Sequence, residues 1–555
     1  MCGIFVSVCH KPSAALDGFA DKLRAANARR DVTNLGPDAN SIYRTSADYL
    51  SSTLFLEFFA SELRLRGLAP VVQPHQQDGD VLCWNGEIFD GISVAPENND
   101  GVELFRKLRT LGTPGEISSR CLFFGRDPLG RRSLLIHRYT SSLPYFLLTS
   151  VSAGLNSCYE FEEINTDYIY CMDFSISNNC KPDFVFTTTH REYLISILYP
   201  SIAKPSRINP ALPPEEFQQV ESLDKIPEYL ADAVAGLKSQ LDQSVMLRVH
   251  DIPQTPKARV AVLFSGGIDS TVLAYFAHKH IPFDEPIDLL NVAFENPRKM
   301  KFQAEGVPKM KRRGKEQRAE KELTQTSYMV PDRITGLQAL EELRRLCPER
   351  VWNFVSFRAQ YEIGLESQTS RPTIESLMLP GRTVMDMSLA LALYFASRGV
   401  GQMHSLPDSD PVPYASTARV LLSGLGSDEL LGGYGRHRSA FNIGGWQAVI
   451  NELQLEIDRI PTRNLGRDDR VISTHGKETR HPFLSLTVVE FLATLPVHFK
   501  MDPRLDVGLG DKMLLRLVAS KVGLVEAGAR KKRAMQFGSH SARMDGEKHG
   551  DTLLE

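Results

Sequence analysis

Short apolar runs separated by turn residues fill the chain from Met1 to about Ser150. The runs read GIFVSV, LFLEFF, VLCWNGEIF, LFFGRD, SLLIH and YFLLTS, with Gly, Pro, Asn and Asp between them. Strands of about five residues between such breaks are typical of antiparallel sheets. Apolar positions three or four residues apart predict helices at Asp17–Arg30 and Gly101–Leu111. Residues 1–200 are therefore expected to form a first domain of antiparallel sheets and helices.

A proline-rich stretch ends this pattern. Residues 199–216 read YPSIAKPSRINPALPPEE, a composition that resists both helix and central strand, so we place a domain boundary there. Beyond it the pattern predicts a helix, a strand, a helix and a strand at Ile226–Val249, Arg259–Phe264, Thr271–His280 and Leu289–Phe294. Such an order predicts an α/β domain with a parallel sheet over residues 216–542. Its ligand is expected at the C-terminal edge of the strands.

Two segments depart from this order. Between Arg298 and Lys321 the chain is rich in Lys and Arg with few apolar residues, which favours a mobile surface insert over a docking segment. Residues 543–555 are polar and charged and are expected to form a loose tail.

Composition narrows the classes of function. Hydrophobic residues make up 42% and charged residues 24% of 555 residues, as in globular proteins that fold into more than one domain. A formal charge of -3 gives no general attraction to nucleic acid or anionic membranes. Eight cysteines without zinc or disulfide spacing indicate a reducing compartment. Without an apolar run of about 20 residues or a signal peptide, we expect a cytoplasmic protein.

Cys2 follows the initiator Met directly. We expect Met1 to be removed, because the next side chain is small. The new α-amine, with a pKa of about 7.7 to 8.0, could then take the proton of the thiol, so one residue would carry both nucleophile and base. Taken alone, a cysteine at this position could equally be a chance occurrence.

An Asn-Gly pair follows an apolar strand in the segment Cys83–Gly91, CWNGEIFDG. The side-chain amide of Asn85 and the backbone N–H of Gly86 could together stabilise an oxyanion. The same pair after a strand could instead form a hairpin turn.

The segment Ser265–Ser270, SGGIDS, follows the RVAVLF strand and opens a helix. Glycines allow backbone N–H groups to turn toward a phosphate, and a helix N-terminus favours negative charge. The segment is neither a Walker A loop nor a dinucleotide fingerprint.

Four N-terminal segments, MCGIF, NLGPD (Asn34–Asp38), WNGEIF and FGRDPLGRRSLL (Phe124–Leu135), resemble the class II glutamine amidotransferases in order and spacing. The resemblance implies an N-terminal nucleophile sandwich, antiparallel sheets between helices, with Cys2 attacking the glutamine side-chain amide. The glutamine-binding residues implied are Arg64 or Arg66, Asn85, Gly86, Glu87 and Asp100. We expect Arg64 and Arg66 to point the same way from a strand.

The second domain resembles the asparagine synthetases. SGGIDS resembles the PP-loop of ATP pyrophosphatases, and three further matches follow in order: VLLSGLGSDELLGGYGRHR (Val420–Arg438), RNLGRDDRVISTHGKETRHPFLS (Arg463–Ser485) and GDKMLLRL (Gly510–Leu517). The likeness covers nearly the whole chain and is closest to the branch called asparagine synthetase domain-containing proteins. It implies ATP as a substrate and Mg2+ as a cofactor.

The resemblance also implies individual roles. ATP-binding residues would be Leu263, Ser265, Gly266, Gly267, Asp269, Ser270, Val292, Ser423 and Gly424. Asp269 and Asp428 would hold Mg2+, and Lys512 would stabilise the charge that develops as a carboxylate attacks the α-phosphorus. The other readings are that Asp269 is a helix cap and Lys512 a solvated surface residue.

Two positions depart from the family pattern. Leu425 stands where the synthetases carry a Glu, and Ser485 stands where their third motif ends in Asp. A leucine cannot act as a base or bind an ammonium, so Glu478 is the candidate that would replace it in catalysis.

The expected reaction converts glutamine, ATP and aspartate into asparagine, glutamate, AMP and pyrophosphate. We expect no nucleic-acid or membrane partner, and a homodimer is the candidate assembly. Two other hypotheses remain: amidation of a different carboxylate, and a synthetase-like pseudo-enzyme or regulatory protein.

Overall fold

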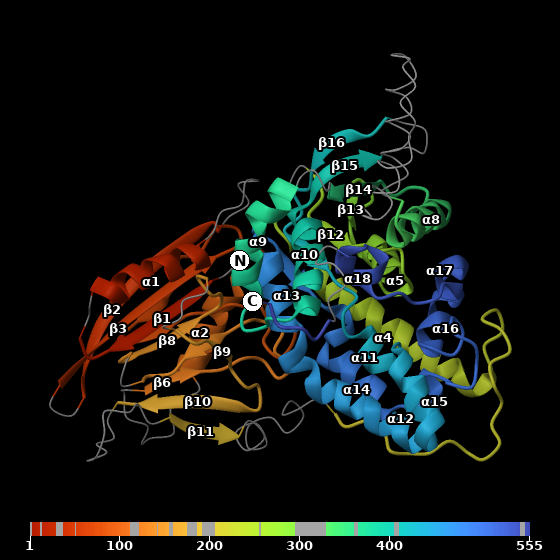
Figure 1. The fold of residues 1–555 in the computed structure, drawn as a ribbon, viewed down its shortest axis with the longest axis horizontal. Helices are drawn as coiled ribbons and strands as arrows, with labels where there is room; N and C mark the ends of the chain where they lie inside the picture. The colour runs from red at the N-terminus through yellow and green to blue at the C-terminus, as the bar shows by residue number, and fades with distance from the viewer. Residues whose placement is uncertain are drawn as a thin grey trace.

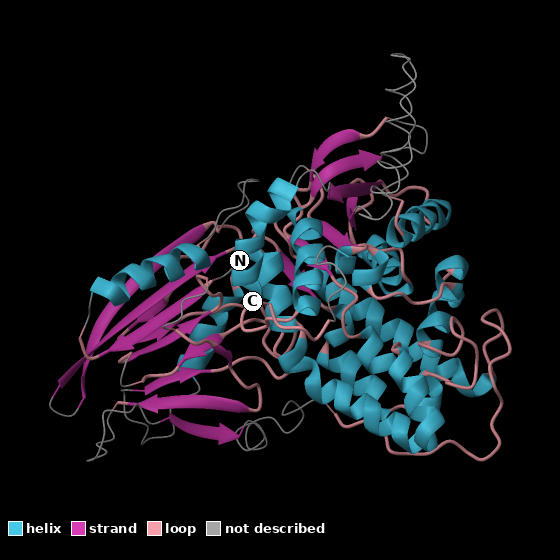
Figure 2. Ribbon diagram, in the orientation of Figure 1, coloured by secondary structure: helices cyan, strands magenta, loops and turns pink. Residues whose placement is uncertain are grey.

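The two halves of the chain lie side by side in a computed structural model (Figure 1). The described residues are 3–11, 14–28, 37–49, 52–110, 121–140, 143–154, 159–174, 186–190, 206–254, 257–294, 329–359, 364–404, 410–543 and 550–554. The half coloured red to orange is built mainly of strands, and the half coloured yellow to blue mainly of helices (Figures 1 and 2). Cys2, Asn34–Gly36 and the insert 298–321 lie outside the described residues.

Two antiparallel sheets pack together in the first half. The larger has the order β2 (Ala39–Tyr49), β3 (Ser52–Glu62), β1 (Ile4–Cys9), β8 (Tyr145–Thr149), β7 (Leu135–His137) and β9 (Glu162–Glu163). The smaller has the order β11 (Phe186–His190), β10 (Tyr168–Asp173) and β6 (Cys121–Phe124). Val6 and Val8 share a core with Phe124, between the sheets, whereas Phe5 shares a second core with Leu23 of helix α1 (Ala14–Asn27). The alternation along β1 therefore builds both cores.

Helices in this half occupy different places. Helix α1 covers the outer face of the larger sheet, whereas α2 (Asp100–Thr110) packs against the short hairpin of β4 (His75–Gln77) and β5 (Asp80–Leu82). The antiparallel sheets are confirmed, and the N-terminal nucleophile fold stays a prediction.

A mixed seven-stranded sheet forms the centre of the second half. Its order is β16 (Val412–Ala415), β15 (Val400–His404), β14 (Trp352–Ala359), β13 (Ile287–Phe294), β12 (Val260–Leu263), β17 (Val420–Leu422) and β18 (Glu478–Arg480). The strands from β14 to β18 in this order are parallel, but β15 and β16 pair antiparallel. The prediction of a parallel sheet is therefore wrong at this edge. Between β15 and β16, residues 405–411 are too few for the crossover that parallel strands need.

Helices cover both faces of this sheet. One face packs against α4 (Ala231–Val249), α5 (Ile268–His280), α8 (Pro331–Leu346), α14 (Leu486–Thr494) and α16 (Met513–Lys521). The other face packs against α9 (Gly364–Met378), α10 (Val384–Arg398) and α13 (Leu465–Ser473). Further helices are α11 (Ser427–Leu431), α12 (Gly435–Arg463), α15 (Val497–Lys500), α17 (Val525–Ala529) and α18 (Met535–Gly538). This is a three-layer α/β/α arrangement.

The ends of the second half are docked. The backbone N–H of Ile208 donates to Gln454 Oε1 at 2.9 Å, so packing onto this half begins within the predicted boundary. At the C-terminus, Leu554 N donates to Arg382 O at 2.8 Å, and Leu553 bridges to Thr383. Residues 550–554 therefore differ from the loose tail that their polarity predicts. Among the described helices, none is long and apolar enough to cross a membrane.

Candidate active site

Two loops meet at the C-terminal edge of the sheet. Strands β12 and β17 are parallel neighbours with Val262 opposite Leu422, so the loops that follow them start at the same level. One loop contains Ser265–Gly267 and the other contains Ser423 and Gly424. A Cβ on Gly424 would lie 2.7 Å from the Cβ of Asp269, so the two loops are in direct contact. The structure thus brings the first two predicted motifs together.

The glycine-rich loop is shaped for a close approach. Gly266 has φ 75, and a Cβ there would overlap the backbone carbonyl of Thr335. Thr335 Oγ1 in turn donates to Ser265 O at 2.8 Å. Gly267 caps α5 without a side-chain hydrogen bond, and Ser270 Oγ donates to its carbonyl at 3.2 Å. The N-terminus of α5 therefore keeps backbone donors available for an anion.

Lys512 joins these loops to a third segment. Its ammonium lies 2.8 and 2.7 Å from the two oxygens of Asp269, 2.7 Å from Asp428 Oδ1 and 3.0 Å from Ser427 Oγ. The lysine is fully buried and takes the left-handed backbone conformation, with φ 52, at the start of α16. The hypothesis of a solvated surface lysine is therefore wrong, and Asp269 pairs with Lys512 rather than capping its helix.

The charges of this cluster reinforce one another. Burial alone would lower the pKa of Lys512, but Asp269 and Asp428 raise it to about 12. Burial alone would raise the pKa of Asp428, but Lys512 and Lys532 lower it to about 2. Lys512 and Asp428 consequently stay charged at neutral pH.

Two basic residues in this cluster were missed from the sequence. Lys532 Nζ lies 2.9 Å from Asp428 Oδ2 and 3.9 Å from the centre of the Tyr434 ring. Arg530 Nη1 donates to the carbonyl of Gly266 at 3.1 Å. The signal was available, because Arg530–Arg533 is a run of four basic residues shortly after the Lys512 motif.

The donor set fits Mg2+ bound together with phosphate. Within the described ranges, no group of three or more His, Cys, Asp or Glu side chains could hold a metal ion. Asp269 and Asp428 both contact the Lys512 ammonium and so lie close together, and Mg2+ typically takes one or two carboxylates plus phosphate oxygens. A Cβ on Gly433 would overlap both Asp428 and Lys512, so the glycine leaves space for their approach.

Apolar residues flank the edge. Val292 is 6% exposed and belongs to the core between β13 and α10, and Leu263 packs against the same core. Leu425 packs against the opposite core, and its N–H donates to Ser423 Oγ at 3.3 Å. The position where a Glu was expected is therefore an apolar contact.

A second group of predicted residues lies in the first half, after β5. Trp84 N–H donates to Gln73 Oε1 at 2.9 Å, and Ile88 N–H donates to Asp100 Oδ2 at 3.0 Å. Asn85 Nδ2 is buried and donates to none of the described residues. No strand follows Gly86 before α2, so the hairpin-turn hypothesis for this pair is wrong. An unpaired buried donor is suited to a ligand oxygen.

The two candidate arginines differ. Arg66 is buried, and its Nε lies 2.9 Å from Glu87 Oε1, whereas Arg64 Nη1 donates to Leu68 O at 2.6 Å. Both follow β3 instead of lying on it, so the expectation that they point the same way is wrong. Burial raises the pKa of Glu87 and that of Asp100 above their ordinary values. The structure brings Arg66, Glu87 and Asp100 together and leaves Arg64 aside.

Glu478 lies between the halves. It is opposite Val420 in the sheet, two positions before the edge that carries Ser423. Its carboxylate pairs with Arg132 at 2.8 Å and with Arg480 at 2.7 Å. Burial would raise the pKa of Glu478, but the two arginines lower it. The structure therefore brings Glu478 to the arginines of the interface and not to Lys512.

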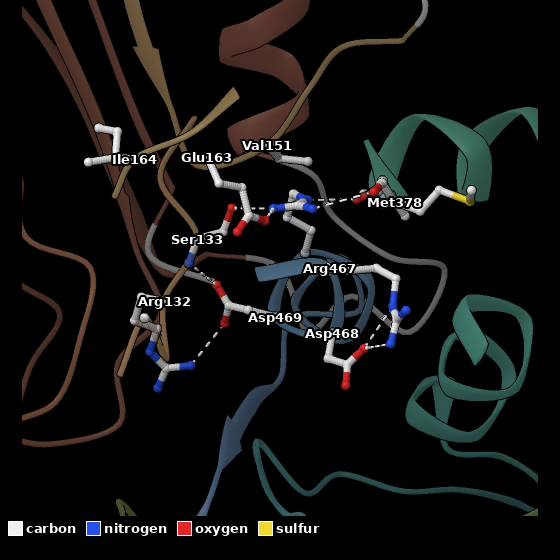
Figure 3. A network of polar contacts seen from close by, with 12 residues as sticks. Arg132, Ser133, Val151, Glu163, Ile164, Met378, Arg467, Asp468 and Asp469 are labelled. Atoms are coloured by element: carbon white, nitrogen blue, oxygen red, sulfur yellow. Dashed lines mark hydrogen bonds and ion pairs between the residues drawn. The ribbon is translucent and has the colours of Figure 1, made fainter. Parts of the chain in front are cut away.

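A polar network joins the halves around Glu478. Asp469 of α13 turns toward the first half, where it accepts hydrogen bonds from Ser133 N at 3.0 Å and Arg132 Nη1 at 2.9 Å (Figure 3). Arg470, also from α13, pairs with Glu163 of β9 at 2.7 Å. Buried pairs of this kind fix the relative position of the halves, since removing one partner leaves an uncompensated charge.

Cys2, the predicted nucleophile, lies outside the described residues. Its neighbour Gly3 is buried, and Gly3 N donates to Ser61 Oγ at 2.9 Å while Ser61 N donates to Gly3 O at 2.9 Å. Ser61 lies near the end of β3, from which the chain continues to Arg66.

Comparison with known proteins gives consistent matches. The family model for asparagine synthase matches residues 442–553. Asparagine synthetase domain-containing protein 1 of Gallus gallus is 34% identical, with 98% of each chain covered. The protein of the same name from Homo sapiens is 34% identical over 98% of this chain and 96% of its own. An asparagine synthetase domain-containing protein of Saccharomyces cerevisiae is 29% identical over 94% of this chain and 89% of its own.

Proposed function

The chain belongs to the family of asparagine synthetase domain-containing proteins, and from this premise we propose that it catalyses glutamine-dependent, ATP-consuming formation of asparagine from aspartate. An asparagine synthase domain supports ATP-dependent amidation in general. Glutamine as the nitrogen source and aspartate as the acceptor are the specific parts of the proposal.

The convergence of Lys512, Asp269 and Asp428 carries the proposal. These side chains come from three segments and meet within 2.7 to 2.8 Å at the sheet edge, beside the glycine-rich loop. A buried cation between two carboxylates, next to free backbone donors, suits the transfer of a nucleotidyl group from ATP.

Carboxylate activation comes first. The acceptor carboxylate oxygen attacks the α-phosphorus of ATP, and pyrophosphate leaves, which gives an acyl-adenylate. Lys512 and Lys532 stabilise the negative charge that develops on the phosphates. Asp269 and Asp428 would hold Mg2+, and the ion would supply positive charge to the pyrophosphate leaving group. Activation is necessary because a free carboxylate has no usable leaving group.

Glutamine supplies the nitrogen. Cys2, freed from Met1, attacks the side-chain amide, and its own α-amine accepts the thiol proton. Asn85 Nδ2 and the Gly86 N–H stabilise the oxyanion, while Arg66 and Asp100 bind the α-carboxylate and the α-amine of glutamine. The protonated α-amine returns its proton to the leaving nitrogen, the C–N bond breaks, and water hydrolyses the resulting thioester to glutamate and free Cys2. Ammonia passes between the halves and attacks the acyl-adenylate, and AMP leaves. The unpaired amide of Asn85 supports this assignment.

Leu425 favours a second candidate, the amidation of a different carboxylate. Its packing against the apolar core removes the carboxylate that synthetases of the usual pattern carry at this position. An acceptor without an α-ammonium group would lose no binding energy at Leu425, because it has no positive charge that needs a carboxylate partner.

Two assays test the proposal. Wild-type protein with glutamine releases glutamate, and Cys2→Ala abolishes this release; unchanged release by the variant excludes Cys2 as nucleophile. Pyrophosphate release is then measured with ATP, Mg2+ and a panel of carboxylic acids. Release with aspartate supports asparagine synthesis, release with another acid only supports the second candidate, and silence with every acid indicates a protein without synthetase activity.

A further inference from the structure

Arg480 contacts both candidate sites. Its backbone carbonyl accepts a hydrogen bond from Ser423 N at 3.0 Å, and Ser423 begins the loop that contacts Asp269. Strand β18 pairs with β17 through Leu422 and Arg480, so this bond continues the ladder into the loop. The backbones of Ser423 and Arg480 are therefore directly joined.

The side chain of Arg480 extends toward the loop that carries Asn85. Its Nη2 lies 3.5 Å from Glu87 Oε2, and its guanidinium carbon lies 5.2 Å from the centre of the Phe89 ring. The side chain is held by Nη1 donating to Arg248 O at 2.8 Å and by the ion pair with Glu478. One residue of the second half thus contacts two residues of the loop Asn85–Phe89.

Phe89 is held by two guanidinium groups. The guanidinium carbon of Arg248 lies 4.5 Å from the centre of the same ring. Among the described residues, Arg248 donates only to Ser244, one turn earlier on α4, and forms no ion pair. Cation–π contacts are strongest for groups removed from water, and Arg248 and Arg480 are both buried. The loop is therefore fixed from the second half.

The loop Asn85–Phe89 has few other supports. It forms no strand, and from its own half it is held by the Ile88–Asp100 hydrogen bond and the Arg66–Glu87 ion pair. A shift of Arg480 would change its electrostatic attraction to Glu87 and its packing against Phe89. These residues are the first and last of the three that follow Gly86. Closely packed groups such as these move between discrete arrangements instead of deforming continuously.

We infer that Arg480 is a positioning residue that couples glutamine hydrolysis to occupancy of the nucleotide site, an inference that rests on the proposed function of the Asn85 loop. Binding of ATP against Ser423 and Gly424 sets the position of the Arg480 carbonyl. The guanidinium then fixes Glu87 and Phe89, which places the Asn85 amide and the Gly86 N–H for the oxyanion. Arg480 itself touches neither reacting group.

The test compares glutamate release with and without ATP, Mg2+ and aspartate in wild type, Arg480→Lys and Phe89→Leu. The lysine keeps the charge but loses the planar fork that reaches both Glu87 and Arg248 O. In wild type we expect glutamate release to be about 5-fold or more faster with ATP, Mg2+ and aspartate than without them, which is the lower end of usual allosteric couplings. In both variants we expect this ratio of the two rates to be near one. Release of AMP with ammonium in place of glutamine reports the second site alone and should change less than about 2-fold.

Arg419→Lys is the matched control. Arg419 also pairs across the halves, with Asp38 at 2.5 and 3.0 Å, but does not touch the Asn85 loop. It should keep the wild-type ratio. A wild-type ratio near one, an unchanged ratio in Arg480→Lys and Phe89→Leu, or an equal loss in Arg419→Lys would each overturn the inference.

Hydrogen exchange separates this inference from the proposed function. If wild type releases no glutamate, the proposed role of the Asn85 loop is wrong, and the coupling is then measured without chemistry. ATP with Mg2+ should slow amide exchange in residues 84–90 of wild type and leave it unchanged in Arg480→Lys. Equal slowing in both proteins, or none in wild type, would overturn the coupling.

Discussion

Replacing Lys512 by Met probes the cluster at the sheet edge. Met has similar length and no charge, so the variant keeps most of the packing and leaves Asp269 and Asp428 facing each other without their shared cation. Breaking a buried ion pair by removing one partner typically costs about 3 to 5 kcal/mol. In the variant Asp428 still forms its ion pair with Lys532 at 2.9 Å. We therefore expect the free energy of unfolding to fall by about 3 kcal/mol, the lower end of this range.

This loss has measurable consequences. For a large domain, 1 kcal/mol shifts the Tm by about 2 °C, so the variant should melt about 6 °C lower. Removal of a charge that stabilises the transition state should reduce AMP formation by about 10²- to 10³-fold. Calorimetry and a pyrophosphate assay measure the two effects. Lys521→Met, an exposed lysine on the same helix, is the control and should change neither.

Acid unfolding provides a further readout for the same variant. The pKa of Asp428 in the folded protein, about 2, is below its ordinary value, so its stabilising contribution is present above about pH 4 and is lost as the pH falls toward 2. Without Lys512 that pKa rises toward its ordinary value, so the variant should lose less stability than wild type as the pH falls from about 4 to 2. A variant that melts like wild type and forms AMP within tenfold of it would refute the assigned role of Lys512.

Three further substitutions test other parts of the structure. Asn85→Ala should lower glutamate release by about 10²- to 10³-fold and spare AMP formation with ammonium, and an equal loss of both in the two assays would exclude an oxyanion role. Gly266→Ala places a Cβ against Thr335 in a left-handed conformation, so calorimetric titration should show at least tenfold weaker ATP binding, and wild-type affinity would contradict the close approach. Asp469→Asn weakens the bonds to Arg132 and Ser133 and should lower the Tm in a scanning experiment, whereas an unchanged Tm would mean that this contact contributes nothing.

Local patterns predicted the elements that position the nucleotide site. The apolar run Val260–Leu263, the glycine turn and the start of α5 follow from spacing and glycine chemistry alone, and the parallel pairing of β12 with β13 follows from the helix between them. The antiparallel edge formed by β15 and β16 was not predictable in this way, because a glycine in β15 (VGQMH) and a proline in β16 (VPYA) weaken the strand pattern.

Contacts between distant segments are what the sequence could not supply. From the sequence, Arg64 and Arg66 are equally good candidates for binding the glutamine α-carboxylate. Only the packing shows that Arg66 is buried against Glu87. Lys532 forms an ion pair with Asp428 and a cation–π contact with Tyr434, both about a hundred residues earlier in the chain. Such pairings depend on how segments far apart in the chain pack together.

Oxygen transfer from the acceptor tests the proposed activation most directly. Aspartate labelled with 18O in its side-chain carboxylate is incubated with the protein, glutamine, ATP and Mg2+, and AMP is examined by mass spectrometry. Attack of that carboxylate on the α-phosphorus predicts one 18O atom in each AMP formed. Unlabelled AMP, or label found only in inorganic phosphate beside ADP, would contradict the formation of an acyl-adenylate at Lys512.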